Sequence, residues 1–80
     1  MLHDEPMTAI STAARGLAGA FALLDDASLR LLGAVHGGGQ DMGAAFADMA
    51  LAKIQAKASV ATIHFADEMW RDLLELQGGP

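Results

Sequence analysis

The sequence predicts an all-α protein, a two-helix hairpin with a Gly-rich loop that is completed by oligomeric helix packing. Apolar residues recur in steps of three and four along two long segments. A run of glycines, Gly37–Gly39, separates the segments. Hydrophobic residues make up 52% of the chain and aromatic residues only 5%, so Ala and Leu dominate and favour close helix packing. We expect one domain over residues 1–80, because a chain of this length has room for one small core at most.

The first helix is expected over residues of about 5–35, with Pro6 suited to its first turn. Its apolar spacing predicts a coiled-coil seam made of Ile10, Ala14, Leu17, Phe21, Leu24, Ser28, Leu31 and Val35. Gly16 and Gly19 interrupt this helix, and each costs about 1 kcal/mol in helix propensity relative to Ala. Either they are merely tolerated, or they admit a neighbouring backbone at short range.

A flexible loop over about 36–40 leads to a second helix over about 41–77, with Asp41 as its expected N-cap. Two apolar lines follow this helix, roughly a third of a turn or more apart. The first line comprises Met42, Phe46, Met49, Ala56, Val60, Ile63, Trp70 and Leu74, with Lys53 and Asp67 as polar interruptions. The second line comprises Ala50, Ile54, Ala58, Ala61, Phe65, Met69, Leu73 and Leu76. One antiparallel helix covers one line only, so the other line is predicted to be an interaction surface.

The composition bears on three properties of the protein: nucleic-acid binding, membrane spanning and secretion through a cleaved signal peptide. The formal net charge of −5 argues against nucleic acid, which requires a basic footprint. We expect no membrane span, because charged residues interrupt both apolar segments. The acidic N-terminus lacks the basic region of a cleaved signal peptide, and the 0 Cys exclude disulfides.

The residues favour no enzyme and no catalytic, cofactor or metal site. No two histidines have the spacing that presents a pair to one metal on a helix; they are His3, His36 and His64. No Ser or Thr has an adjacent base, so nucleophilic catalysis has no support. A group of carboxylates near the C-terminus is interpreted as a solvated face in which Arg71 pairs with Glu68 and Glu75; the group is Asp67, Glu68, Asp72 and Glu75.

The C-terminal segment resembles a known family. Ala66–Met69, read Ala-Asp-Glu-Met, is followed by Leu73–Leu76, read Leu-Leu-Glu-Leu. This order is similar to the terminal helix of bacterial flagellar axial proteins, the rod and hook subunits. Thr8–Ala13, with Gly16-Leu17 after it and Leu24-Asp25 further on, resembles the opening helix of the same proteins. The β-rich outer domains of that family are replaced here by the Gly loop.

The resemblance implies a non-enzymatic structural protein, a minimal axial subunit that packs its two helices together and then against neighbours in a tube wall. It also implies export through a type III apparatus to the flagellar basal body and periplasm, a role in motility, and partners that are copies of itself or other axial proteins. The first alternative is a cytoplasmic helical-bundle dimer that acts as an export chaperone or regulatory binding module. Another is a needle subunit of a related secretion system, although the turn of such subunits normally contains Pro.

Within a subunit, we expect Ile10, Leu17, Phe21 and Leu24 to meet Met49, Val60, Ile63 and Trp70. The second line would bind the next subunit. The full set of residues predicted to serve helix packing and assembly is Ile10, Leu17, Phe21, Leu24, Phe46, Met49, Ile54, Val60, Ala61, Ile63, Phe65, Met69, Trp70, Leu73 and Leu74.

Overall fold

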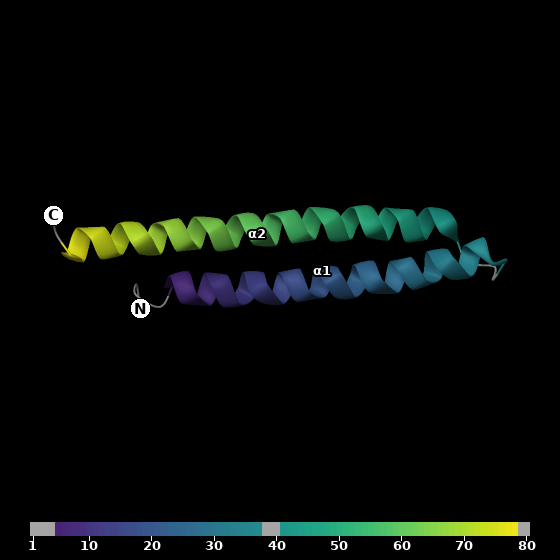
Figure 1. Cartoon of the computed structure of the whole chain (residues 1–80), viewed down its shortest axis with the longest axis horizontal. Helices are drawn as coiled ribbons and strands as arrows, with labels where there is room; N and C mark the ends of the chain where they lie inside the picture. Colours follow the sequence, from purple (N-terminus) through teal and green to yellow (C-terminus); the bar gives the residue numbers. More distant parts are fainter. Residues whose placement is uncertain (1–4, 38–40, 79–80) are drawn as a thin grey trace.

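The computed structural model describes residues 5–37 and 41–78, which form two antiparallel helices, α1 (Glu5–Val35) and α2 (Met42–Gly78). The predicted all-α hairpin is confirmed. Figure 1 shows the helices side by side, with α2 projecting past the first turn of α1. The molecule measures 64 × 19 × 12 Å, and its radius of gyration of 18.3 Å far exceeds the roughly 12 Å of a compact domain of this length. The hairpin is therefore a rod with little interior.

The helix ends next to the loop are held by local hydrogen bonds. Asp41 caps α2, since its Oδ1 accepts a hydrogen bond from the backbone N–H of Ala44 at 3.1 Å, and this confirms the predicted N-cap. At the end of α1, Gly37 has a φ of 78°, a left-handed conformation that glycine adopts without strain. Its N–H donates to the carbonyl of Ala34 at 3.1 Å. The remainder of the expected loop, 38–40, lies outside the described residues.

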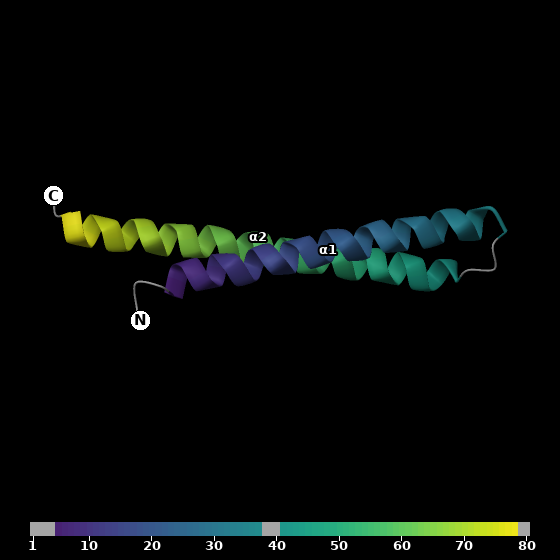
Figure 2. The ribbon, with the colours of Figure 1, turned by 90° about the horizontal axis from the view of Figure 1, so that it is seen from below.

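Alanines line the seam between the two helices. Among the described residues, the fully buried ones are all alanines: Ala13, Ala20 and Ala27 of α1, with Ala45, Ala52 and Ala66 of α2. In α1 they recur every seven residues, and half-buried Ser59 completes the same series in α2. Larger residues at the intervening seam positions are half-buried: Ile10, Leu17, Leu31, Met49, Ile63 and Trp70. A small residue once per heptad on both sides lets the backbones approach closely where the helices cross (Figure 2).

A close approach of the helices explains Gly16, one of the two glycines near the middle of α1. A Cβ built on Gly16 would lie 2.8 Å from Ser59 Oγ, which is shorter than a normal contact. Gly16 therefore admits the neighbouring helix at short range, as one of the two alternatives proposed. A Cβ on Gly19 would meet nothing within 4 Å, so Gly19 is merely tolerated.

The predicted seam agrees with the observed seam at alternate positions. At the other positions, the residue in the observed seam is the one just before the predicted residue. Ile10 and Leu17 of α1, with Met49 and Ile63 of α2, lie in the seam as expected. The prediction that Phe21 and Val60 pack inside the hairpin is wrong, because Ala20 and Ser59 take those places. The same displacement moves the seam from Ala14, Ser28, Val35 and Phe46 to Ala13, Ala27, Ala34 and Ala45. Reading for hydrophobicity selects the larger of two adjacent apolar residues, whereas close packing of the helices selects the smaller.

A rod built this way leaves much apolar surface in solvent. The accessible surface is 5836 Å², whereas a compact monomer of 8.3 kDa has roughly 4,600 Å². The difference, on the order of 1,200 Å², is surface that the hairpin cannot bury against itself.

Candidate interaction surface

The first exposed apolar surface runs along α2, and two of its members, Ala58 and Ala61, border the grooves between the helices. We call it the outer line, and it consists of Ala50, Ile54, Ala58, Ala61 and Phe65, all exposed. Ile54 and Phe65 are 64% and 67% exposed. Of the rest of the predicted second line, Leu73 and Leu76 are also exposed and Met69 is half-buried. This line therefore has no cover within the chain.

A second apolar surface runs along one side of the seam. We call it the apolar flank, and it consists of six exposed residues: Met7, Phe21 and Val35 of α1, with Phe46, Val60 and Leu74 of α2. Phe21 and Val60, 58% and 54% exposed, border one groove of about 500 Å³. Leu17 and Ala56 also line the groove, with Lys57 and His64. Ala61 of the outer line completes the lining, so the two surfaces meet there.

The apolar flank repeats at every second heptad. Val35 and Phe46 lie two heptads from Phe21 and Val60 toward the loop, and Met7 and Leu74 lie two heptads toward the chain ends. Residues seven apart on a helix share a face, and the two helices are antiparallel, so each pair has the register of the Phe21–Val60 pair. The positions between the pairs are small or charged: Ala14 and Ser28 of α1, with Lys53 and Asp67 of α2.

Charges near the C-terminus pair along α2. Arg71 Nε lies 3.3 Å from Asp67 Oδ2, and this partner differs from the Glu68 and Glu75 expected from spacing. Glu68 Oε1 instead lies 3.0 Å from His64 Nε2. The carboxylates thus form a solvated helix face with ordinary ion pairs.

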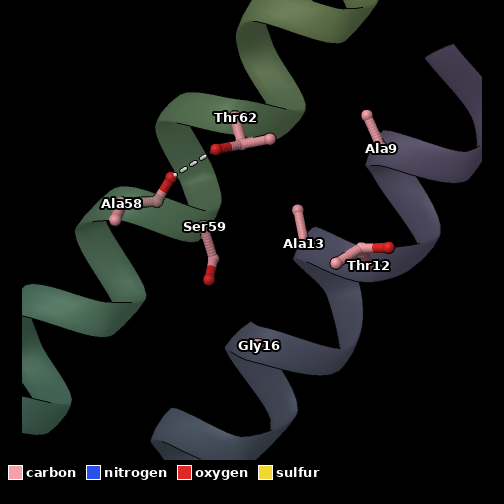
Figure 3. Close-up of a pocket in the computed structure, with 7 residues that line it drawn as sticks. All are labelled: Ala9, Thr12, Ala13, Gly16, Ala58, Ser59 and Thr62. Atoms are coloured by element: carbon pink, nitrogen blue, oxygen red, sulfur yellow. Dashed lines mark hydrogen bonds between the residues drawn. The ribbon is translucent and has the colours of Figure 1, made fainter. Parts of the chain in front are cut away.

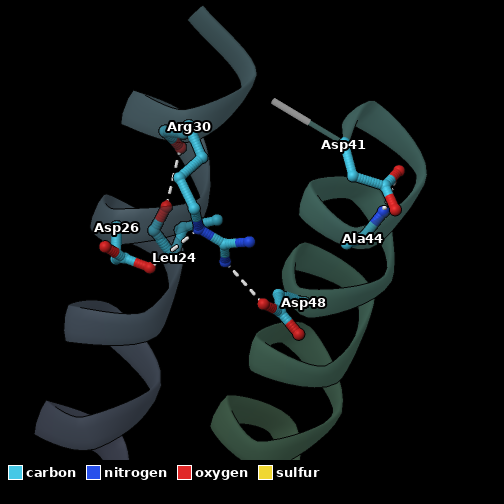
Figure 4. Close-up of polar contacts among 7 residues, drawn as sticks. Leu24, Asp26, Arg30, Asp41, Ala44 and Asp48 are labelled. Carbon is cyan, nitrogen blue, oxygen red and sulfur yellow. Dashed lines mark hydrogen bonds and ion pairs between the residues drawn. The ribbon is translucent and has the colours of Figure 1, made fainter. Parts of the chain in front are cut away.

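An ion-pair cluster crosses the seam on the side opposite the apolar flank. The Arg30 guanidinium donates to Asp48 of α2, and its Nε donates to Asp26 Oδ2 at 2.9 Å (Figure 4). The hydrogen bond to Asp48, followed by that to Asp26, raises the pKa of Arg30. This cluster links the two helices near the loop. Sequence reasoning missed it, because Arg30 and Asp48 become neighbours only once the antiparallel register is known.

A groove of small residues lies between the two helices, nearer the chain ends than this cluster. Figure 3 shows its lining residues on both helices. Its volume is about 510 Å³, and its lining comprises Ala9, Thr12, Ala13, Gly16, Ala58, Ser59 and Thr62. The Thr62 hydroxyl donates to the carbonyl of Ala58 at 2.9 Å, inside its own helix. The groove contains no ionisable side chain.

The histidines are scattered along the hairpin. His36 Nδ1 lies 2.8 Å from the carbonyl oxygen of Leu32, His64 pairs with Glu68, and His3 lies outside the described residues. Over residues 5–37 and 41–78, no three His, Cys, Asp or Glu side chains are grouped so that they could hold a metal ion.

The residues predicted for packing and assembly therefore fall into two groups. Those that are half-buried are Ile10, Leu17, Met49, Ile63, Met69 and Trp70. The others are exposed: Phe21, Leu24, Phe46, Ile54, Val60, Ala61, Phe65, Leu73 and Leu74. Leu24 sits at the seam edge and is 37% exposed.

One stretch of α1 has the length and apolar composition of a membrane-spanning helix. It covers Met7–Val35, and an 18-residue window within it has a mean hydropathy of 1.3. Core helices of soluble proteins and N-terminal signal sequences have the same properties. The absence of a membrane span, expected from the charges in this stretch, thus stays a prediction.

No family model, no curated protein and no solved structure matches this chain. The fold and surfaces define a class, an elongated antiparallel helical hairpin with an alanine seam and extensive exposed apolar surface.

Proposed function

We propose that this chain is a non-enzymatic structural subunit of the flagellar rod and hook type, which joins neighbouring subunits through the outer line of α2. One observation carries the proposal: α1 covers a single face of α2, and the outer line keeps Ile54 and Phe65 in solvent. A subunit within a tube wall needs both a face for its own second helix and a face for its neighbours.

The motif behind the flagellar resemblance has a physical role in the hairpin. Ala66, its first residue, is buried in the seam against α1. Asp67 and Glu68 follow outside the seam, where their part-exposed carboxylates pair with Arg71 and His64. The motif thus combines a close helix contact with a polar edge, which supports a role in helix packing.

Burial of the outer line supplies a driving force for assembly. Complete burial of a large apolar side chain contributes about 1.5–3 kcal/mol. Ile54 and Phe65 each have roughly two thirds of that surface still to bury, which corresponds to about 1–2 kcal/mol for each residue at every contact. In this proposal the neighbours are further copies or other axial proteins, reached after type III export to the basal body.

Deletion in a flagellated host, with a motility assay and imaging of isolated basal bodies, tests the biological setting. Loss of motility and of a basal-body component is expected, whereas full motility with intact basal bodies would contradict the proposal. Phe65→Arg tests the surface in purified protein, where sedimentation should show loss of large assemblies with helicity unchanged. Leu29→Arg is the matched control, because Leu29 is equally exposed, at 63%, but belongs to α1.

The apolar flank favours a second candidate, the cytoplasmic helical-bundle dimer that acts as an export chaperone or regulatory module. This flank meets the outer line at Ala61, but Ile54 and Phe65 lie outside its groove, so a dimer could form through the flank without any larger assembly. A protein that stays a dimer at all concentrations, in a host whose filaments do not need it, would favour this candidate over the axial subunit.

A further inference from the structure

We propose that the apolar flank pairs with the same flank of a second copy, in an antiparallel two-fold dimer centred on Phe21 and Val60. The pairing differs from the axial contact, because it needs no other protein and centres on Phe21 and Val60, and it assigns a direction and a register to a dimer formed through the flank. Two hairpins joined in this way form a four-helix bundle in which every neighbouring pair of helices is antiparallel.

The exposed area is sufficient for a specific interface. The six large residues of the apolar flank are 48% to 64% exposed. With full side-chain areas of about 150–200 Å², they present roughly 600 Å² per copy. Pairing two flanks buries about 1,200 Å², the lower end of the range for specific interfaces. Polar residues at the edges add to this figure.

The charges of the flank are arranged for a copy that runs in the opposite direction. Lys53 lies one heptad from Val60 toward the loop, and Asp67 lies one heptad from it toward the chain end. A two-fold axis through the Phe21–Val60 pair exchanges these two positions, so Lys53 of each copy faces Asp67 of the other. Lys53 makes no ion pair among the described residues, whereas Asp67 is already paired with Arg71.

The apolar residues obey the same symmetry. The axis sets Phe21 against Phe21, Val60 against Val60, and Phe46 against Leu74. On α1 it sets Met7 against Val35 and Ala14 against Ser28, so no charge faces an apolar residue. Lys57 comes near His64 of the other copy only at the solvated edge, where salt screens the interaction.

If the two hairpins pointed in the same direction, Lys53 and Asp67 of the two copies would not face each other. This parallel arrangement places α2 opposite α1 of the other copy, so Lys53 faces Ser28 and Asp67 faces Ala14. Burial of a charge against an uncharged group costs free energy that an opposite charge would recover. The antiparallel dimer is closed, so a third copy cannot add through the flank. Because Ile54 and Phe65 stay exposed, the dimer can exist before any assembly through the outer line.

Charge exchange tests the pairing directly. Lys53→Glu and Asp67→Lys should each weaken the dimer, roughly tenfold in Kd, and the double variant should restore it. Sedimentation equilibrium measures Kd, and circular dichroism checks that the hairpin stays helical. Failure of the double variant to restore dimerisation would overturn the antiparallel pairing.

Phe21→Ser at the centre of the flank should dissociate the dimer, whereas Leu29→Ser, at a comparably exposed position off the flank, should not. A wild-type protein that is a helical monomer at micromolar concentration would overturn the proposal, even if Phe65-dependent assemblies form. A dimer in a strain that swims normally without the protein would support this inference and contradict the axial function.

Spin labels determine the direction of pairing. The chain has 0 Cys, so Leu76→Cys gives one labelled site per copy. Leu76 lies 16 residues beyond Val60, so the two labels should be about 48 Å apart along the bundle at 1.5 Å per residue. A short distance, comparable to the width of the bundle, would show parallel pairing and overturn the proposal.

Discussion

Replacement of Gly16 tests how closely the helices approach. Gly→Ala within a helix normally adds about 1 kcal/mol of stability, because alanine has the higher helix propensity. At position 16, however, the added Cβ would lie 2.8 Å from Ser59 Oγ. The hydroxyl must then leave its rotamer, at a cost of about 0.5–1.5 kcal/mol. Gly16→Ala should therefore change the free energy of unfolding by less than about 0.5 kcal/mol in either direction.

Two further variants isolate this contact. Gly19→Ala should give the full gain of about 1 kcal/mol, since its Cβ meets nothing within 4 Å. Ser59→Ala removes the hydroxyl and leaves only the Ser59 Cβ position, 3.9 Å from the new Cβ, which is an ordinary contact. In the Ser59→Ala background, Gly16→Ala should therefore stabilise as much as Gly19→Ala does.

Urea unfolding followed by circular dichroism measures the free energy of unfolding of the wild type and of the four variants. One protein concentration is used throughout, because association adds to apparent stability. The double-mutant cycle should give a coupling of about 0.5–1.5 kcal/mol between positions 16 and 59. If Gly16→Ala stabilises the protein as much as Gly19→Ala does while Ser59 is present, the inferred close approach of the helices at Gly16 is refuted.

Three other changes test the seam and its alignment. Ala27→Leu should destabilise the hairpin by about 1–3 kcal/mol in the same urea assay, whereas Ala22→Leu on the exposed side should change it by less than about 0.5 kcal/mol. Trp70→Ala should cost less than the roughly 3 kcal/mol of a fully buried Trp, because Trp70 is half-buried; a larger loss would show a deeper anchor. Asp48→Asn should lower Tm at low salt, because Arg30 loses its charged partner on α2. The difference in Tm between variant and wild type should shrink toward 1 M salt, where the ion pair is screened, and a salt-independent difference would contradict this.

The helices and their ends could be predicted because local residues determine them. Asp41 has the side chain that caps a helix, and glycine at position 37 suits a left-handed turn. Neither feature depends on the other helix. The long 3–4 apolar spacing predicted two helices for the same reason.

The seam could be predicted only in part, because the choice between adjacent apolar residues depends on the distance between the helices. Ala20 and Phe21 both fit a 3–4 pattern, and only a close approach favours the alanine. A signal was present: Lys53 and Asp67 interrupt the first predicted line of α2, whereas Ala52 and Ala66 beside them continue an unbroken small-residue series. A polar interruption at each second heptad indicates a line beside the contact rather than within it.

The alanine seam also makes the alignment of the helices nearly periodic. A slide of α2 by one heptad, about 10.5 Å, would set small residues against small residues again. The features that do not repeat along the rod are the Arg30–Asp48 ion pair, the Gly16–Ser59 contact and the larger seam residues, which range from Ala56 to Trp70 at equivalent positions of α2. A slide would break the first two and change which larger side chains meet, so these unlike positions, rather than the repeating alanines, specify the register.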